Sequence, residues 1–295
     1  MKDQDRARIG VIGGSGLYEM KGITRVKEAR VKTPYGPPSG PIVLGDLAGV
    51  RCAFLPRHGR GHILLPSEIP QRANIWALKS LGVERILAVS AVGSLKEELP
   101  PRRFVFPDQL IDRTKGRPGT FFGDGVVAHV AFDKPFCAEV SKTLHAAAQG
   151  LGIASDRGGT YVCMEGPAFS TRAESELHRS MGASLIGMTA SPEAKLAREA
   201  ELCYGLAALV TDYDCWKEGE EVSTEKVVET LVANVANAQR LLAAAIPALA
   251  SLPRTCRCAS ALSGALFTAP SAMAPKTLKK LDLLVGKYVK KGAPK

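Results

Sequence analysis

The feature that most constrains the fold is an alternation of short apolar runs with longer stretches whose apolar residues recur every three or four positions. Short runs of this kind predict β-strands, and the longer stretches predict amphipathic helices. The expected strands are 9–12, 42–44, 52–55, 86–89, 104–105, 161–164, 185–187 and 207–210. The expected helices are 70–81, 134–151, 171–182, 193–204 and 223–252, the last with Ser223 as N-cap. This order predicts an α/β fold, a single domain with a central mixed sheet flanked by helices.

The net charge of +10 is concentrated at the C-terminal end. Residues 253–295 hold nine Lys and Arg against Asp282, a net charge of +8, so residues 1–252 carry only +2. We therefore expect a domain over 1–252 and a basic C-terminal extension over 253–295, packed on the domain or at an oligomer interface. A nearly neutral domain gives no electrostatic reason to expect nucleic acid as a substrate.

The chain shows no pattern of a secreted or membrane protein. The N-terminus is charged, and the glycines that follow interrupt the apolar run that a signal peptide needs. The apolar tract 241–252 is broken by Pro247 and is too short for a membrane span. Seven cysteines, an odd number in a long chain, favour a cytoplasmic protein with mostly free thiols.

The segment 9–16 predicts a buried strand that runs into a glycine turn carrying Ser15. Backbone N–H groups of such a turn can bind an oxyanion, and a plain structural turn is the alternative. The segment lacks the Lys-Ser/Thr pair of a P-loop and the third glycine of a dinucleotide-binding fingerprint.

A basic cluster follows at 56–62. Arg57 can bind a phosphate through two N–H groups, and His58 adds a further hydrogen-bonding group. His58 and His62 lie four residues apart, but the Glu of a His-Glu-x-x-His zinc motif is missing, so we expect no metal here. A solvated basic loop is the alternative.

Six motifs occur together and in order, and their combination identifies a family. They are GGSGL at 13–17, RHGRGH at 57–62, QRANIWAL at 71–78, EGPAFSTRAE at 165–174, MT at 188–189 and TDYDCW at 211–216. Over residues 8–252 the chain resembles the 5′-methylthioadenosine phosphorylases of the trimeric purine nucleoside phosphorylase group. The resemblance implies a pentosyltransferase of purine and methionine salvage that releases adenine and 5-methylthioribose 1-phosphate.

The same resemblance implies the partners. Inorganic phosphate is a co-substrate, no metal or redox cofactor takes part, and the protein is a homo-oligomer, a trimer or a hexamer of two trimers. Neither nucleic acid nor a membrane is an expected partner. The segment 277–289 predicts a helix whose apolar face could pair two trimers.

The resemblance also assigns the site residue by residue. Phosphate binding is assigned to Ser15, Arg57, His58, Ser90, Ala91 and Thr189. Met188 is expected beneath the ribose, with Phe169 flanking base and sugar and Ser170 beside the base. The 5′ end is expected to contact Thr224, Val227 and Val228, with His129 supplied by a neighbouring subunit. Thr224 is more polar than the residue often found there, so tolerance of a 5′-hydroxyl stays open.

Asp212 and Asp214 carry the chemistry that discriminates best between substrates. A leaving purine accumulates negative charge, which an acid near N7 relieves, so Asp212 requires a partly buried carboxyl with a raised pKa. Asp214 can accept from a 6-amino group. The relatives that cleave inosine and guanosine carry Glu where Ser170 stands and Asn at the base-reading loop. These differences favour 6-aminopurines, because a carboxylate would repel a 6-oxo group.

Three alternatives remain at this point. One is a purine nucleoside phosphorylase that prefers adenosine, inosine or 5′-methylthioinosine, one is a nicotinamide-dependent reductase, and one is a non-catalytic protein whose basic tail binds nucleic acid. Cys256 and Cys258 open the tail as a Cys-x-Cys pair, which some thermostable relatives link with disulfide or redox roles. In a reducing compartment we expect two free thiols.

Overall fold

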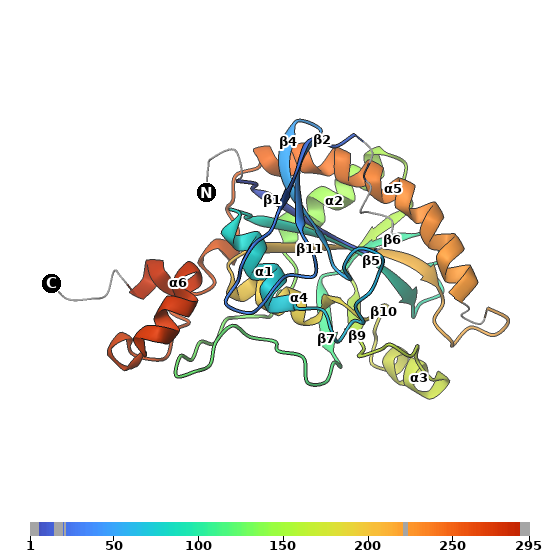
Figure 1. The fold of residues 1–295 in the computed structure, drawn as a ribbon. Helices are drawn as coiled ribbons and strands as arrows, with labels where there is room; N and C mark the ends of the chain where they lie inside the picture. The colour runs from blue at the N-terminus through green and yellow to red at the C-terminus, as the bar shows by residue number, and fades with distance from the viewer. Residues whose placement is uncertain (1–5, 15–19, 21, 221–223, 290–295) are drawn as a thin grey trace.

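The computed structural model describes residues 6–14, 20, 22–220 and 224–289. In this part of the chain an eleven-stranded mixed sheet forms the centre of the molecule, with helices on both faces (Figure 1). The central strands are β1 (Ile9–Gly13), β4 (Val50–Pro56), β5 (Arg85–Ser94) and β11 (Cys203–Asp212). β1 pairs in parallel with β4 and β5, and β5 pairs in parallel with β11.

The remaining strands extend this centre on both sides. They are β2 (Thr24–Ala29), β3 (Ile42–Leu47), β6 (Phe104–Phe106), β7 (Gln109–Asp112), β8 (Ser155–Arg157), β9 (Thr160–Cys163) and β10 (Leu185–Gly187). The helices are α1 (Gln71–Ser80), α2 (Ala138–Gly150), α3 (Arg172–Ser180), α4 (Ala190–Glu199), α5 (Thr224–Ser251) and α6 (Pro275–Val289).

Alternate residues of the central strands supply two separate cores. On β11, Tyr204 and Leu206 belong to the core that contains α1 and α4, whereas Ala207 and Leu209 belong to the core that contains α2 and α5. Successive side chains of a strand point to opposite faces, so a strand between two helical layers must be apolar throughout. This explains why β11 is an almost continuous apolar run.

All eight predicted strands and the five helices predicted before residue 252 are present, which confirms the fold class. Three strands were missed because β2, β7 and β8 are exposed or half-buried and show no apolar pattern. The predicted helix 193–204 extends too far. α4 ends at Glu199, and Glu201 adopts a left-handed φ of 56° before β11 begins. Ser223, the expected N-cap of α5, lies outside the described residues.

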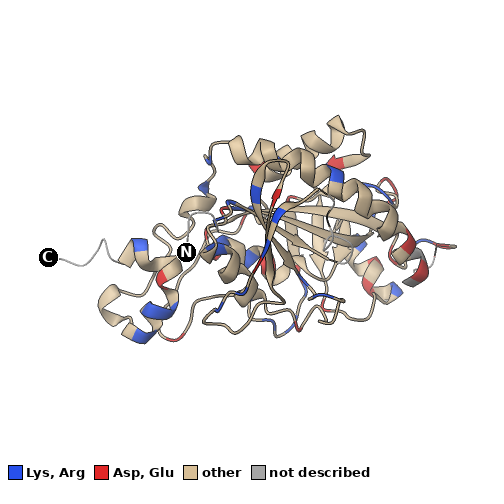
Figure 2. Ribbon diagram, turned by 45° about the horizontal axis from the view of Figure 1, so that its top comes forward, with Lys and Arg blue, Asp and Glu red and all other residues tan. Residues whose placement is uncertain are grey.

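The C-terminal segment packs on the domain. α6 buries Leu281, Leu284 and Val285 in the same core as α1 and α4, and Leu278 and Tyr288 pack against it. Lys287 forms an ion pair with the buried Glu201, and the blue stretches of the ribbon in Figure 2 show the Lys and Arg positions of this segment at one end of the molecule. The expectation that the apolar face of this helix pairs two trimers is wrong, because its own domain buries three of these five residues and packs against the other two.

We predict that Leu284→Ala lowers the free energy of unfolding by about 2–5 kcal/mol, the usual cost of truncating a buried leucine. Leu284 is 3% exposed, whereas its neighbour Leu283 is 37% exposed. Leu283→Ala is therefore the matched control and should change the free energy by about 0.5 kcal/mol or less. Urea denaturation measures both. Equal small losses would mean that α6 does not pack as described.

Candidate active site

A cavity of about 400 Å³ lies where β4, β5, β10 and β11 meet the loops that follow them and the first half of α5. Grooves at strand ends are the usual place for ligand sites in open α/β sheets. Ten of the residues predicted for the site line this cavity: Arg57, His58, Ser90, Ala91, Phe169, Met188, Thr189, Asp212, Asp214 and Val227.

Five predicted residues are not seen in the cavity wall. Ser15 lies outside the described residues, as does the side chain of Thr224 at the start of α5. Ser170 lies just behind the wall, where the Cys215 thiol donates to its carbonyl oxygen. Val228 is 51% exposed on α5. His129 packs its ring edge against Phe267, with the ring centroids 4.8 Å apart, and does not line the cavity of its own chain.

A buried ion pair holds the arginine that lines the cavity. Arg57 follows β4, and its Nε and Nη2 donate to the two carboxylate oxygens of Glu193 on α4 at 2.9 Å each. Both side chains are 1% exposed. Arg57 Nη1 donates to the carbonyl oxygen of Val89 at 2.8 Å, and the Tyr204 hydroxyl donates to Glu193 at 2.7 Å. Three of the five guanidinium N–H groups thus hold the arginine in place.

Two hydroxyls meet beside this arginine. Ser90 on β5 and Thr189, which directly precedes α4, lie 3.2 Å apart between their oxygen atoms. Either hydroxyl can donate to the other, and each keeps further hydrogen-bonding capacity for a ligand. The sheet and the helix therefore bring together two neutral groups that suit an oxyanion.

His58 is neutral at neutral pH. Its Nδ1 lies 2.9 Å from the carbonyl oxygen of Leu64, which requires a proton on Nδ1 and leaves Nε2 as an acceptor. Burial lowers the pKa of His58 to about 4. The ring stacks on His62 with centroids 4.2 Å apart. Among the described residues, these two histidines belong to no group of three or more side chains that could hold a metal ion.

Asp212 also lines the cavity and lies at the end of β11, where it pairs with Gly93, three residues after Ser90 on β5. Its Oδ2 accepts from the Thr211 hydroxyl at 2.7 Å, and its Oδ1 accepts from the backbone N–H of Asp214 at 2.8 Å. Burial raises the pKa of Asp212, although these two hydrogen bonds act in the other direction. A Cβ on Gly93 would lie 2.9 Å from Oδ1, so a larger residue at this position would have to displace the Asp212 carboxylate.

Asp214 is held in an unusual position. Its backbone has a left-handed φ of 52°, a region that non-glycine residues seldom adopt and that is frequent at binding sites. The side chain is 4% exposed, and burial raises its pKa. Its Oδ2 has no hydrogen-bond partner among the described residues. A buried acceptor without a partner is costly, so a ligand donor at this position would be favourable.

The backbone at Gly166 lies close to the Met188 side chain. Gly166 has a φ of 70°, and a Cβ there would lie 2.6 Å from the Met188 sulfur. Arg117 donates from Nη1 to the Met188 carbonyl oxygen at 2.7 Å and forms an ion pair with Glu165. These contacts fix Met188 against the cavity, and the sequence analysis did not identify Arg117.

The sequence analysis also missed most of the apolar lining. Leu231 and Val235 of α5 line the cavity with Val227, and Ile63, Leu64, Leu65 and Pro66 line it from the loop after β4. Val227, Leu231 and Val235 follow one another at a spacing of four, which places them on one face of the helix. That spacing is a signal from which Leu231 and Val235 could have been found.

The cavity is lined by an arginine and two hydroxyls and also by two buried carboxyls. These groups suit a ligand that has both an anionic and a basic part. The chain belongs to the phosphorylase superfamily, whose family model matches residues 8–247. Membership in this family argues against the alternative of a nicotinamide-dependent reductase.

The relatives are similar over almost the whole chain. An S-methyl-5′-thioadenosine phosphorylase of Geobacter sulfurreducens is 56% identical over 95% of this chain and 99% of its own. A crystal structure of a methylthioadenosine phosphorylase from an Antarctic soil metagenomic library is 51% identical, with a TM-score of 0.91, over 95% of this chain and 99% of that one.

A more distant structure carries a ligand. A variant of the adenosine/methylthioadenosine phosphorylase of Schistosoma mansoni, in complex with methylthioadenosine, is 37% identical with a TM-score of 0.82. The similarity covers 88% of this chain and 96% of that chain. Within the described residues, no helix combines the length and the apolar character that crossing a membrane requires.

We predict that Arg57→Ala lowers the free energy of unfolding by about 3–5 kcal/mol, because Glu193 is left as a buried charge without a counter-ion. The double variant Arg57→Met/Glu193→Gln removes both charges and should recover at least half of that loss. Arg172→Ala is the control, since the Arg172–Glu218 pair is exposed and should contribute about 1 kcal/mol or less. Thermal and urea denaturation measure all three. No recovery in the double variant would contradict this role of the pair.

Proposed function

We propose that this protein cleaves 5′-methylthioadenosine with inorganic phosphate and releases adenine and 5-methylthioribose 1-phosphate. The observation that carries the proposal is that one cavity is lined by Arg57, Ser90 and Thr189 and also by Asp212 and Asp214. The names of the relatives, at 50–56% identity, support the same reaction. It is a pentosyl transfer in purine and methionine salvage.

Phosphate occupies the end of the cavity near Arg57. The guanidinium has two N–H groups beyond those bound to Glu193 and Val89, and the hydroxyls of Ser90 and Thr189 lie beside it. The motif resemblance assigns Ala91 and Ser15 to the same subsite. Ala91 lines the cavity, and Ser15 lies outside the described residues. Because neutral His58 presents Nε2 as an acceptor, it suits the P–OH group of HPO4²⁻ better than a charged oxygen. The reaction needs no metal or redox cofactor.

The ribose lies between phosphate and purine, above Met188 and beside Phe169. As the glycosidic bond lengthens, positive charge builds up on the sugar, and the bound phosphate dianion stabilises it before attacking C1′. Holding phosphate in place also removes the entropic cost of bringing the two reactants together. Met188 supplies a flexible, polarisable contact below the sugar.

The purine lies against the two carboxyls. Asp212 is the acid that gives or shares a proton with N7, which its burial and raised pKa support. The unpartnered Oδ2 of Asp214 accepts from the 6-amino group. Ser170 lies behind this pair, and its hydroxyl lowers the pKa of Asp214, opposing the effect of burial. The arrangement favours 6-amino over 6-oxopurines.

We predict that Asp212→Asn lowers the turnover of 5′-methylthioadenosine by about 10²–10⁴, the usual contribution of a positioned acid. The loss on 5′-methylthioinosine should be smaller. An asparagine N–H can donate to both N7 and the 6-oxygen of a 6-oxopurine, whereas a 6-amino group is itself a donor. Steady-state rates on both nucleosides measure this. Parallel losses on the two substrates would contradict the assignment of the base-reading carboxyls.

The 5′ end of the nucleoside meets the apolar end of the cavity. Val227 and Leu231 of α5 face this end together with Ile63 from the loop after β4. An apolar wall favours a methylthio group over a hydroxyl. The alternative is a purine nucleoside phosphorylase with preference for adenosine, inosine or 5′-methylthioinosine, and the Schistosoma relative named for both adenosine and methylthioadenosine supports keeping it.

We predict that Val227→Thr lowers the ratio of kcat/KM for 5′-methylthioadenosine to that for adenosine by about tenfold, the order expected for one small apolar contact. Val228→Thr is the matched control. Val228 is the next residue on α5 but is 51% exposed and absent from the cavity wall, so the ratio should stay within about twofold. Equal changes in both variants would exclude Val227 from the 5′ subsite.

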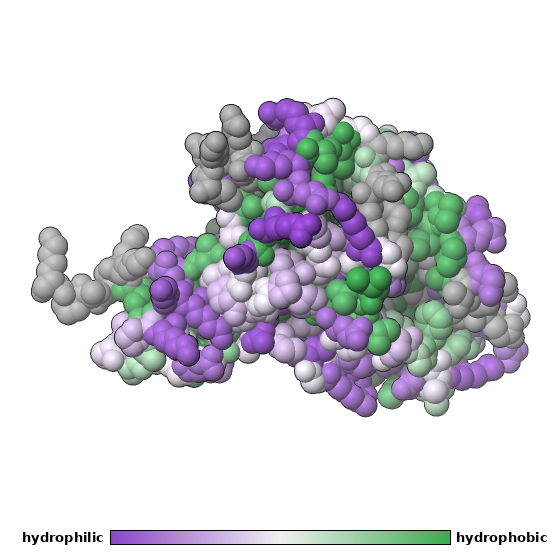
Figure 3. All heavy atoms as spheres, in the orientation of Figure 1, coloured by the Kyte–Doolittle hydropathy of each residue, from purple (hydrophilic) through white to green (hydrophobic). Residues whose placement is uncertain are grey.

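The site is completed by a neighbouring subunit in a trimer. Large apolar side chains remain exposed near the cavity and near His129: Ile63 at 72%, Phe169 at 51% and Phe267 at 71%. Figure 3 shows separate apolar patches between hydrophilic side chains on one face of the molecule. Exposed apolar patches are typical of interaction surfaces. His129, next to Phe267, reaches the 5′ end of the neighbour's nucleoside.

We predict that mixing His129→Ala and Asp212→Asn subunits restores activity after dissociation and reassembly. In a ring, some sites then receive a wild-type His129 and a wild-type Asp212 from different chains. Each single variant must first be nearly inactive. Absence of recovery in mixed oligomers of confirmed composition would place His129 outside the neighbour's site.

A further inference from the structure

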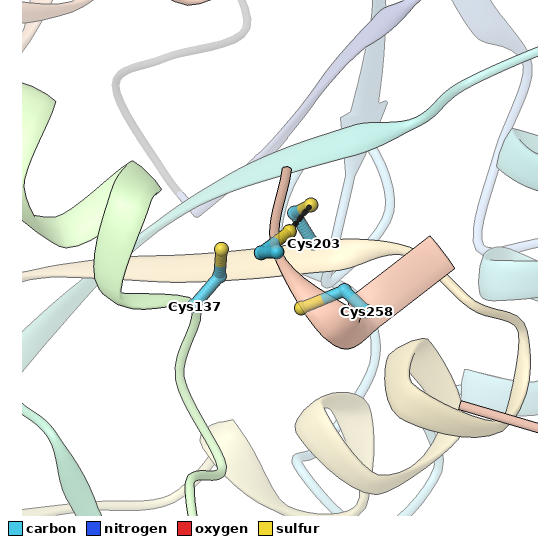
Figure 4. A group of neighbouring side chains, drawn as sticks. Cys137, Cys203 and Cys258 are labelled. Atoms are coloured by element: carbon cyan, nitrogen blue, oxygen red, sulfur yellow. Dashed lines mark hydrogen bonds between the residues drawn. The ribbon is translucent and has the colours of Figure 1, made fainter. Parts of the chain in front are cut away.

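Four cysteines that are far apart in sequence converge at one point outside the substrate cavity. Cys137 precedes α2, Cys203 begins β11, and Cys256 and Cys258 lie in the turn after α5. Figure 4 shows Cys137, Cys203 and Cys258 gathered between the start of α2, the strand β11 and the segment that follows α5. Cys137, Cys203 and Cys258 are buried, and Cys256 is partly buried.

The distances between the four sulfurs fit a single metal ion. All four Sγ atoms lie within 4.8 Å of one another, and Cys203 Sγ lies 3.3 Å from Cys256 Sγ. Zinc in a structural site binds four thiolates in a tetrahedron at about 2.3 Å each, which places the sulfurs about 3.8 Å apart. Small side-chain rotations are enough to reach that geometry.

A guanidinium cation lies beside the cluster. Arg254 donates from Nε to Cys203 Sγ at 3.4 Å, in the position of an outer hydrogen bond that orients a metal ligand. Four soft sulfur donors select zinc over hard cations such as magnesium.

We propose that Cys137, Cys203, Cys256 and Cys258 bind one Zn²⁺ ion as a tetrahedral tetrathiolate site. Each thiol releases its proton to solvent on binding, and no electron is transferred. The four thiolates and the ion carry a net charge of −2, which the adjacent Arg254 partly offsets. All four positions are protein ligands, so the site is closed and structural, not catalytic.

The zinc ion would fasten the C-terminal segment to the sheet. Cys256 and Cys258 come a few residues after α5, whereas Cys137 and Cys203 belong to the α2 and β11 side of the core. A metal that joins these parts contributes its binding free energy to the folded state. None of the four cysteines lines the substrate cavity, so this inference stands apart from the proposed function.

Metal content measures the proposal directly. The full chain is produced in zinc-supplemented medium, purified with a thiol reductant and without chelator, and analysed by mass spectrometry for metals. We expect about one zinc per chain in the unmodified protein and in the control Cys215→Ser, because Cys215 lies outside the cluster. Cys256→Ser/Cys258→Ser should retain less than a tenth of that zinc, and circular dichroism shows whether this variant is folded.

A second measurement does not depend on any variant. Cobalt added to the reduced, metal-free protein should give the absorption bands of a tetrahedral thiolate complex, and zinc added afterwards should remove them. Failure of the reduced protein to bind either metal would overturn the proposal. Two disulfides among these four cysteines in freshly isolated protein, seen as the loss of four hydrogens by mass, would also overturn it, as would iron in place of zinc.

Discussion

The rest of the site depends on the buried ion pair between Arg57 and Glu193. The arginine leaves the end of β4 and the glutamate comes from α4, so their two hydrogen bonds fix the distance between the sheet and the helix that follows Thr189. The backbone N–H of Arg57 also binds the carbonyl oxygen of Gly13 at the end of β1. Two charges that are 1% exposed are stable only while each neutralises the other, so the pair determines where the remaining guanidinium N–H groups point.

At Asp212 and Asp214, burial disfavours the charged form of the side chain. Within the described part of the chain, neither Asp212 nor Asp214 forms an ion pair of the kind that Glu193 forms with Arg57, and burial raises the pKa of each carboxyl. A carboxyl that resists ionisation can donate or share a proton, which a leaving purine requires. One fold thus lines a single cavity with a buried cation and with two carboxyls whose pKa values are raised.

Much of this was predictable from sequence because the buried strands are apolar on both faces and the motif residues follow them directly. Ser90, Thr189 and Asp212 line or border the cavity as their positions predicted. The sequence pattern did not identify Glu193 as the partner of Arg57. A glutamate in an amphipathic helix normally faces solvent, and only the tertiary fold brings this one to Arg57. The cysteine cluster was hidden for the same reason: only Cys256 and Cys258 are neighbours in sequence. The exposed strand β2 lacked the apolar alternation on which strand prediction rests.

The central claim is that phosphate, held beside Arg57, attacks the sugar while the carboxyls receive the purine. The origin of the new oxygen at C1 of the sugar product tests it most directly. The reaction is run with 5′-methylthioadenosine and unlabelled phosphate in water enriched in oxygen-18, and the sugar product is analysed by mass spectrometry. The account predicts 5-methylthioribose 1-phosphate without label. Free 5-methylthioribose carrying oxygen-18 at C1, formed at the same rate without phosphate, would contradict it.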